Sequence, residues 1–202
     1  YEEQLSDEDA SPPSPRRASL DRASPKPLRD ADPELARLVA GLEVQYSELK
    51  FGSQIGTGYY GEVYEATLSG RRVAVKVLNS SLTPSLRKAF LREMQDSPHV
   101  VRLLGASVKP YCCVIMELAD GGSLHDLLYV RPRPLSLAQA LQIGRDVAEA
   151  LRHLHARRPA PLLHRDVTSK NVLVRLEPDP DAAHSHAARF RGLLSDFGIA
   201  RP

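Results

Sequence analysis

The stretch of sequence that decides the fold is Leu162-Leu163-His164-Arg165-Asp166-Val167-Thr168-Ser169-Lys170-Asn171-Val172-Leu173-Val174. It begins with apolar residues, then gathers ionisable and amide side chains, and ends in an alternating run typical of a β-strand. A polar segment held between two apolar segments indicates a polar site supported by a core. Asp166 can accept a proton from an attacking hydroxyl, and Asn171 can offer an amide oxygen to a hard cation such as Mg²⁺.

A second carboxylate follows at the end of another apolar strand, in Leu193-Leu194-Ser195-Asp196-Phe197-Gly198. Two carboxylates and an amide on loops after strands predict a metal and phosphate site. The alternative is a chance order of ordinary loop charges. With His164-Arg165-Asp166, then Asn171 five positions after the aspartate, then Asp196-Phe197-Gly198, the chain resembles the eukaryotic protein kinases.

A glycine-rich run lies between two predicted strands, Glu48–Ile55 and Glu62–Leu68, and contains Gly56, Gly58 and Gly61. Glycines let backbone N–H groups approach phosphate oxygens without interference from a Cβ. Dinucleotide-binding folds use the same spacing, but there the glycines open a helix. Here they open a β-branched run, which argues against a dinucleotide site. The run is similar to the glycine-rich loop of kinases, with Val63 in the expected position after it.

Ser69-Gly70 is predicted to be a two-residue hairpin turn, after which Arg72–Leu78 returns as a strand. A period of two places the strand's three valines on one face, with Ala74 and Lys76 on the other. If the valines face the core, the other face lines a cleft. There a small residue leaves room for a flat ring, and an ammonium reaches phosphates. The alternative for Lys76 is a solvated strand charge.

Thr83-Pro84 predicts the start of a helix with an apolar stripe. Glu93 lies beside this stripe, and the resemblance pairs it with Lys76. The alternative is a surface glutamate, because His99 follows Glu93 by only six positions. That is about one helical turn less than the resemblance implies.

The next predicted strands are Leu103–Val108 and Tyr111–Leu118, followed by a connector, Glu117–Ser123. Ser123 is expected to cap a short helix. A capping box at Ser136 predicts a long helix to about residue 156. The inner face of that long helix is predicted to contain Leu137, Leu141, Val147, Ala148, Leu151 and Leu154.

The resemblance implies an α+β, two-lobed fold, with an antiparallel five-stranded sheet and one helix in the N-lobe and a mainly helical, truncated C-lobe. It also implies two cofactors, ATP and Mg²⁺. The catalytic residues it implies are Asp166, Lys76 and Lys170, and the Mg²⁺ ligands are Asn171 and Asp196. The residues it implies around ATP are Ile55, Gly56, Gly58, Gly61, Val63, Ala74, Lys76, Glu93, Met116, Glu117, Ala119 and Leu173.

The acceptor hydroxyl is predicted from the loop after Asp166. Serine/threonine kinases usually carry a lysine two residues after this aspartate, where this chain has Thr168. Many tyrosine kinases carry arginine four residues after it, where this chain has Lys170. The chain looks most like the tyrosine-kinase-like branch, whose members mostly phosphorylate serine and threonine of proteins. Tyrosine as acceptor is the alternative, and an ATP-binding pseudokinase or scaffold is the alternative function.

Composition places the chain among globular proteins, with 42% hydrophobic and 26% charged residues. A net charge of +2 does not indicate a nucleic-acid partner. No apolar run approaches the roughly eighteen residues of a membrane span, and no signal peptide is recognisable. Cys112 and Cys113 lack disulfide or metal-ligand spacing and are expected to be buried thiols. We therefore expect a cytoplasmic, reducing location, with an upstream membrane segment left open.

The expected organisation is a tail over residues 1–46, an N-lobe with hinge over 47–119, and a partial C-lobe over 120–202. The tail is rich in serine, proline and charge, and its composition predicts disorder. Ser19 follows two arginines, and Ser14 and Ser24 precede prolines, so upstream kinases are expected partners. The resemblance implies further C-lobe residues, so we expect a fragment that is inactive alone. A regulatory tail attached to a non-functional truncated product is the remaining alternative.

Overall fold

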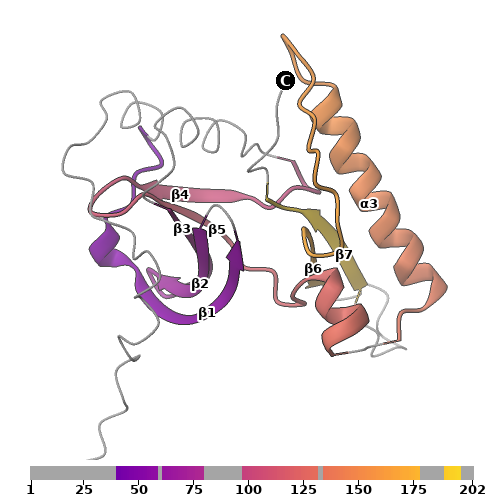
Figure 1. Cartoon of the computed structure of the whole chain (residues 1–202), viewed down its shortest axis with the longest axis horizontal. Helices are drawn as coiled ribbons and strands as arrows, with labels where there is room; N and C mark the ends of the chain where they lie inside the picture. The colour runs from indigo at the N-terminus through magenta and orange to yellow at the C-terminus, as the bar shows by residue number, and fades with distance from the viewer. Residues whose placement is uncertain (1–39, 59–60, 80–96, 132–133, 178–188, 197–202) are drawn as a thin grey trace, which may run out of the picture.

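The computed structural model describes residues 40–58, 61–79, 97–131, 134–177 and 189–196, and these form two lobes. A curved sheet makes up the first lobe, and a long helix with a two-stranded hairpin makes up the second (Figure 1). The helix expected after Thr83 lies outside the described residues, as do the tail serines.

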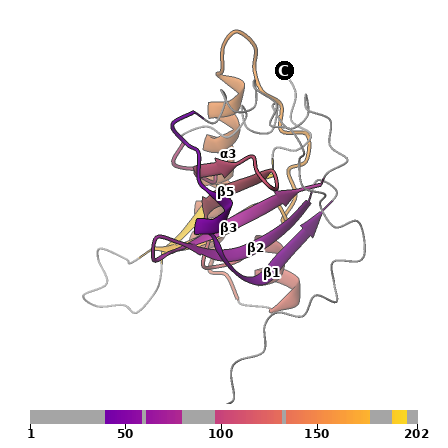
Figure 2. The same cartoon turned by 90° about the vertical axis from the view of Figure 1, so that its left-hand side faces the viewer.

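The N-lobe sheet has five strands in the order β1-β2-β3-β5-β4, and every neighbouring pair is antiparallel. Strands β1, β2, β3 and β5 lie side by side in the second view (Figure 2). The predicted five-stranded antiparallel sheet is therefore confirmed. The strands are β1 (Lys50–Gly58), β2 (Gly61–Leu68), β3 (Arg71–Leu78), β4 (Leu103–Ser107) and β5 (Cys113–Glu117).

The turn between β2 and β3 forms as its two residues predict. Ser69 and Gly70 have φ angles of 49° and 80°, which is the pair of left-handed conformations that a type I′ hairpin turn needs. Leu68 pairs with Arg71 directly across the turn. Because this turn sets the register, the valines of β3 enter the N-lobe core as expected. The buried core of this lobe consists of Leu49, Ala66, Val73, Val75, Val77, Cys113 and Ile115.

Residues just before position 47 contact the N-lobe sheet. The backbone N–H of Val44 donates to the carbonyl of Ala106 at 2.9 Å, and the N–H of Ala106 donates to the carbonyl of Leu42 at 2.8 Å. Tyr46 packs its ring against Phe51 and Tyr111. Part of the segment that composition assigned to the tail therefore pairs with β4, through residues 42–44. Cys112 and Cys113 are buried thiols, as expected.

The C-lobe is built from α3 (Leu137–His155) packed against the hairpin of β6 (Val172–Glu177) and β7 (Arg189–Leu194). The predicted capping box starts α3, because Ser136 Oγ accepts from the N–H of Gln139 at 3.2 Å. Gln139 Oε1 accepts in return from the N–H of Ser136 at 3.0 Å. The buried core of this lobe consists of Val100, Ile143, Ala150, Leu154, Leu162, Val172, Val174, Phe190 and Leu194.

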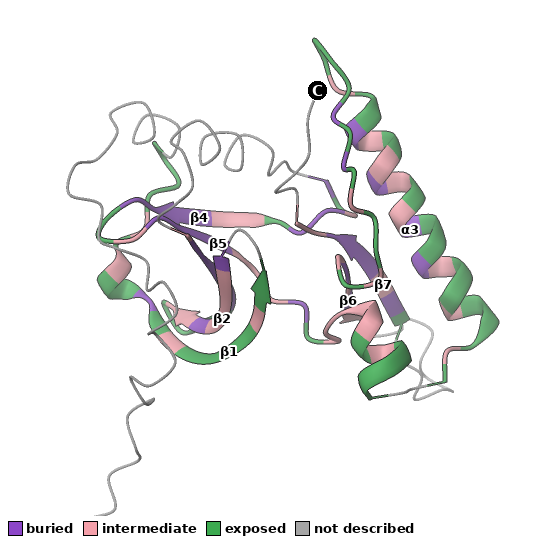
Figure 3. Ribbon diagram, viewed as in Figure 1, coloured by how far each residue is buried: buried purple, intermediate pink, exposed green. Residues whose placement is uncertain are grey.

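The predicted inner face of α3 is partly wrong. Leu137 and Leu141 are 76% and 65% exposed, and Ala148 is exposed too. Leu154 is buried as predicted, and the other buried residues of α3 are Ile143, Asp146 and Ala150 (Figure 3). The prediction from hydrophobic residues did not include Asp146, because a buried carboxylate breaks the apolar pattern of the face. In the part of the chain that the structure describes, no helix is both long and apolar enough to cross a membrane.

Candidate active site

Lys76 and Asp196 form an ion pair between the lobes. Lys76 lies in β3 and is 5% exposed, and its Nζ donates to Asp196 Oδ1 at 2.8 Å. Asp196 follows the end of β7 with a left-handed φ of 62°, an unusual conformation for a residue with a Cβ. A buried ammonium requires such an anionic partner. The contact therefore brings a cation from the first lobe to a carboxylate of the second.

The loop before β6 positions Asp166 through Asn171. The Nδ2 group of Asn171 donates to Asp166 Oδ2 at 2.8 Å and to the Asp166 carbonyl at 2.9 Å. The backbone N–H of Asn171 donates to the carbonyl of Thr168 at 3.0 Å. Because the amide nitrogen makes these bonds, the amide oxygen of Asn171 is left to serve as a ligand.

His164 connects this loop to the chain that follows β7. Its Nε2 lies 2.9 Å from the carbonyl oxygen of Ser195, so Nε2 must carry the proton. Its Nδ1 accepts from the backbone N–H of Asp166 at 3.3 Å, so Nδ1 must be unprotonated. Only the neutral Nε2–H tautomer satisfies both bonds. Burial lowers the pKa of His164, outweighing the opposite effects of the Ser195 carbonyl and the nearby carboxylates of Asp166 and Asp196.

The two polar loops are held together at the end of the β6–β7 hairpin. The N–H and the hydroxyl of Ser195 both donate to the carbonyl of Asn171, at 2.8 and 3.0 Å. These bonds keep Asp196 next to Asn171. Asp196 and Asn171 present a carboxylate and an amide oxygen, the hard donors that Mg²⁺ takes in combination with phosphate oxygens. The chemistry of this donor pair fits a magnesium ion.

Apolar residues predicted around a flat ring meet in one cluster. Met116 and Leu173 pack against the buried Val101, Ala119 and Leu193. Ala74 pairs with Met116 across β3 and β5. Residues from β3, β5, the connector and β6 are thus brought together at the junction of the lobes.

The glycine run forms the end of the β1–β2 hairpin, beside β3. Gly58 pairs with Gly61, and Val63 pairs with Lys76. Gly61 has a φ of 154°, and a Cβ there would overlap the backbone carbonyl of Val77. Only glycine therefore allows this close approach of β2 to β3.

Two predicted site residues are exposed, and a third lies outside the described residues. Ile55 is exposed on β1. Lys170 is also exposed, and among the described residues no hydrogen bond or ion pair joins it to Asp166. Glu93 lies outside the described residues, so its expected pairing with Lys76 stays a prediction.

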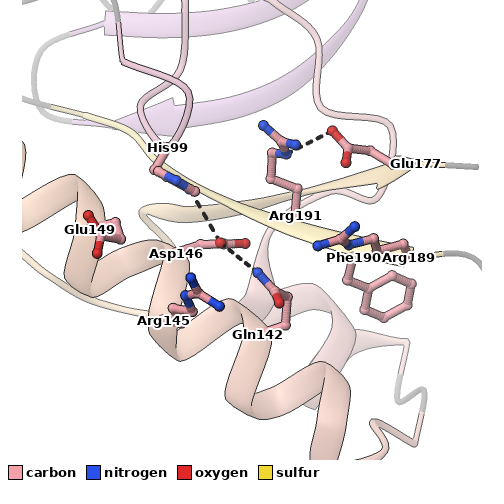
Figure 4. Close-up of a pocket in the computed structure, with 9 residues that line it drawn as sticks. All are labelled: His99, Gln142, Arg145, Asp146, Glu149, Glu177, Arg189, Phe190 and Arg191. Atoms are coloured by element: carbon pink, nitrogen blue, oxygen red, sulfur yellow. Dashed lines mark hydrogen bonds and ion pairs between the residues drawn. The ribbon is translucent and has the colours of Figure 1, made fainter. Parts of the chain in front are cut away.

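A polar recess lies elsewhere, between α3 and β7, with a volume of about 240 Å³ (Figure 4). Its centre is the buried Asp146, which accepts from Gln142 Nε2 at 2.8 Å and from the N–H of Gly192 at 2.9 Å. His99 Nδ1 lies 3.3 Å from the same carboxylate. The recess shares no lining residue with the predicted site. Sequence reasoning missed Asp146, whose only signal was a carboxylate among the apolar residues of a helix.

The fold and the site together define a two-lobed protein of the kinase class, in which a glycine-rich hairpin lies beside the strand that carries Lys76. Lys76 contacts Asp196, and Asn171 contacts Asp166. The chain belongs to the protein tyrosine and serine/threonine kinase family, whose model matches residues 49–202.

Curated relatives agree with this family. The chain is 36% identical over 168 residues to a probable LIM domain-containing serine/threonine-protein kinase of Dictyostelium discoideum, covering 79% of the chain and 24% of that protein. It is 32% identical over 166 residues to a serine/threonine-protein kinase of Arabidopsis thaliana, covering 79% and 26%. It is 36% identical over 135 residues to mitogen-activated protein kinase kinase kinase 7 of Drosophila melanogaster, covering 65% and 20%. These matches confirm the resemblance to serine/threonine kinases of the tyrosine-kinase-like branch, and the chain spans about a quarter or less of each relative.

Proposed function

We propose that this chain is the nucleotide-binding and catalytic part of an enzyme that transfers the γ-phosphoryl group of ATP to serine and threonine hydroxyls of proteins. The observation that carries the proposal is the 2.8 Å contact between Lys76 Nζ and Asp196 Oδ1. It joins a phosphate-binding cation to a candidate metal ligand across the junction of the lobes. The names of the relatives, which are serine/threonine-protein kinases, support the choice of acceptor.

In this proposal the cluster around Met116, Ala119 and Leu173 holds the adenine ring. The small Ala74 leaves room for it, and Ile55 and Val63 cover it from the glycine loop. Backbone groups of Glu117 and Ala119 meet the polar edge of the ring. The N–H groups of the glycine loop and the ammonium of Lys76 hold the phosphates, since both favour negative charge. Glu93 is proposed to support Lys76.

Asp166 is proposed to orient the acceptor hydroxyl and take its proton as the bond to phosphorus forms. Asn171 holds Asp166 through its Nδ2, so the carboxylate oxygen at 2.8 Å is oriented before substrate arrives. Asn171 Oδ1 and the carboxylate of Asp196 would hold Mg²⁺, which would neutralise charge on the phosphate oxygens. The exposed Lys170 adds a cation beside the acceptor. Catalysis is then mainly positioning and charge neutralisation.

The substitution Asp166→Asn in the full-length protein tests the proposal. We expect turnover on serine- and threonine-containing protein substrates to fall by about 10²–10⁴-fold, because the proton acceptor is lost. ATP affinity should stay nearly unchanged, since Asp166 does not hold the nucleotide. The measurements are steady-state phosphate transfer and the dissociation constant for ATP. Asp126→Asn, at an aspartate after the connector, is the matched control and should leave both unchanged.

Loss of transfer and ATP binding together would show that Asp166 has another role. ATP binding by the wild type without transfer would identify a pseudokinase, and transfer to tyrosine alone would change the acceptor.

Regulation by upstream kinases at Ser14, Ser19 and Ser24, and a reducing, intracellular location, also belong to this proposal. Phosphopeptide mapping of the protein from cells tests the first of these, and finding all three serines unmodified would remove it.

A further inference from the structure

The side chain of Glu117 connects the start of the connector to both lobes. Glu117 is the last residue of β5, and its side chain is 11% exposed. Its Oε1 accepts from the backbone N–H of Arg102, just before β4, at 2.8 Å. Its Oε2 accepts from Arg175 Nη1, in β6 of the other lobe, at 2.7 Å. One carboxylate therefore ties the N-lobe sheet to the C-lobe hairpin.

Arg175 is itself fixed within the hairpin. Its Nη2 lies 3.1 Å from Glu177 Oε1, and Arg191 Nε lies 2.8 Å from the same oxygen. Figure 4 shows the Arg191–Glu177 pair at the edge of the polar recess. With 31% of its side chain exposed, Arg175 is partly shielded from water, where a charge-assisted hydrogen bond is stronger than at the surface. Its contact with Glu177 therefore fixes the guanidinium that binds Glu117.

The rest of the connector is attached to β6 by other bonds. The N–H of Leu176 donates to Asp120 Oδ1 at 2.9 Å, and the N–H of Gly121 donates to the carbonyl of Val174 at 2.9 Å. The N–H of Val174 donates to the carbonyl of Gly122 at 2.8 Å. These bonds hold the C-lobe end of the connector. Among the described residues, Arg175–Glu117 is the ion pair that holds its N-lobe end to β6.

We propose that Arg175 is a positioning residue for the nucleotide, acting through Glu117. The inference rests on the proposed function, in which backbone groups of residues 117–119 meet the adenine edge. Two hydrogen bonds to a flat ring require a donor and an acceptor held in fixed directions. The backbone N–H of Arg102 and the guanidinium of Arg175 each bind one oxygen of the Glu117 carboxylate, so the peptide groups beside it have little freedom to turn. Without Arg175, a smaller fraction of molecules has these backbone groups in the geometry that binds adenine. The apparent affinity for ATP falls in proportion to that fraction.

Arg175→Gln in the full-length protein tests this role, with the Michaelis constant for ATP, the turnover number and the dissociation constant of a fluorescent ATP analogue as measurements. We expect the Michaelis constant for ATP and the dissociation constant of the analogue to rise by roughly three- to tenfold. Turnover at saturating ATP should change less than about twofold, because the groups at the phosphates are untouched. Arg175→Lys, which keeps one charged donor, should recover part of the affinity.

Arg191→Gln is the matched control, since it removes a partner of Glu177 in the same hairpin and leaves the Arg175–Glu117 contact in place. It should leave the Michaelis constant for ATP unchanged. If Arg175→Gln does not fold, Glu117→Gln tests the same contact and must raise that constant by a similar factor. A folded variant with wild-type affinity for ATP overturns the positioning role. Failure of the wild type to bind ATP overturns the proposed function instead.

Discussion

At the scale of single residues, His164 shows how one ring supports the site without reaching it. Both ring nitrogens have fixed roles, one donating to Ser195 and one accepting from Asp166. A proton added to Nδ1 would place two donors against each other at the Asp166 N–H. The folded state therefore favours the neutral ring, which agrees with the lowered pKa that burial gives this histidine.

His164 should make the protein less stable as the pH falls. Above its ordinary pKa of about 6.5 the ring is neutral in both states and has no effect. Below that value the unfolded chain takes up a proton that the folded protein does not, so the free energy of unfolding falls. The loss levels off below the folded pKa. Urea unfolding at about pH 7.5 and 5.5 measures it.

His164→Gln, whose side-chain amide can still donate to Ser195, is the comparison for that experiment. This variant should be less stable than wild type at about pH 7.5. Its free energy of unfolding should fall less than that of wild type between about pH 7.5 and 5.5. The same pH dependence in both proteins would show that other groups cause it.

At the scale of elements, the sequence predicted the turns and helix starts that are determined by neighbouring residues in the chain. The β2–β3 hairpin follows from Ser69-Gly70 and an alternating strand, and the start of α3 follows from the capping box at Ser136. Hydrophobic spacing predicted only part of the inner face of α3, including Leu154. Asp146 occupies that face because Gln142 and the N–H of Gly192 satisfy its carboxylate, and Gly192 comes from a strand far along the chain.

Gly61→Ala should damage the β2–β3 hairpin, whereas Gly58→Ala should not. A Cβ at Gly61 would overlap the carbonyl of Val77, and its φ of 154° is rarely adopted by other residues. Nothing lies within 4 Å of a Cβ at Gly58. We expect Gly61→Ala to cost about 1–3 kcal/mol of stability and Gly58→Ala less than about 1 kcal/mol. Denaturant unfolding measures both, and equal effects would contradict the close approach seen at Gly61.

At the scale of the whole molecule, each lobe has its own core, and the predicted site lies where they meet. Beyond the contacts of Lys76 and Glu117, the chain entering β4 joins β7: the N–H of Val101 donates to the carbonyl of Leu194 at 3.0 Å. Motif order predicted which residues form the proposed site. It did not predict that Lys76 would contact Asp196, 120 positions away, because only the packing of the lobes sets that pairing.

A ligand held by both lobes should stabilise the molecule as a unit. ATP with Mg²⁺ at about one hundred times its dissociation constant should add about 2.7 kcal/mol to the free energy of unfolding. For a domain of this size that corresponds to a rise of about 5–10 °C in melting temperature. Chelating Mg²⁺ should remove part of the rise, because the phosphates would then face Asp196 without a cation between them.

Asp196→Asn should abolish the Mg²⁺-dependent part of that rise, since an amide binds the ion more weakly than a carboxylate. Asp120→Asn, at an aspartate that holds the N–H of Leu176, should keep it and serves as the control. Thermal melting of the full-length protein with ATP, with and without Mg²⁺, provides the comparison. A rise that is the same with and without Mg²⁺ in the wild type would exclude Asp196 and Asn171 as metal ligands. The absence of any rise with ATP would exclude a nucleotide site between the lobes.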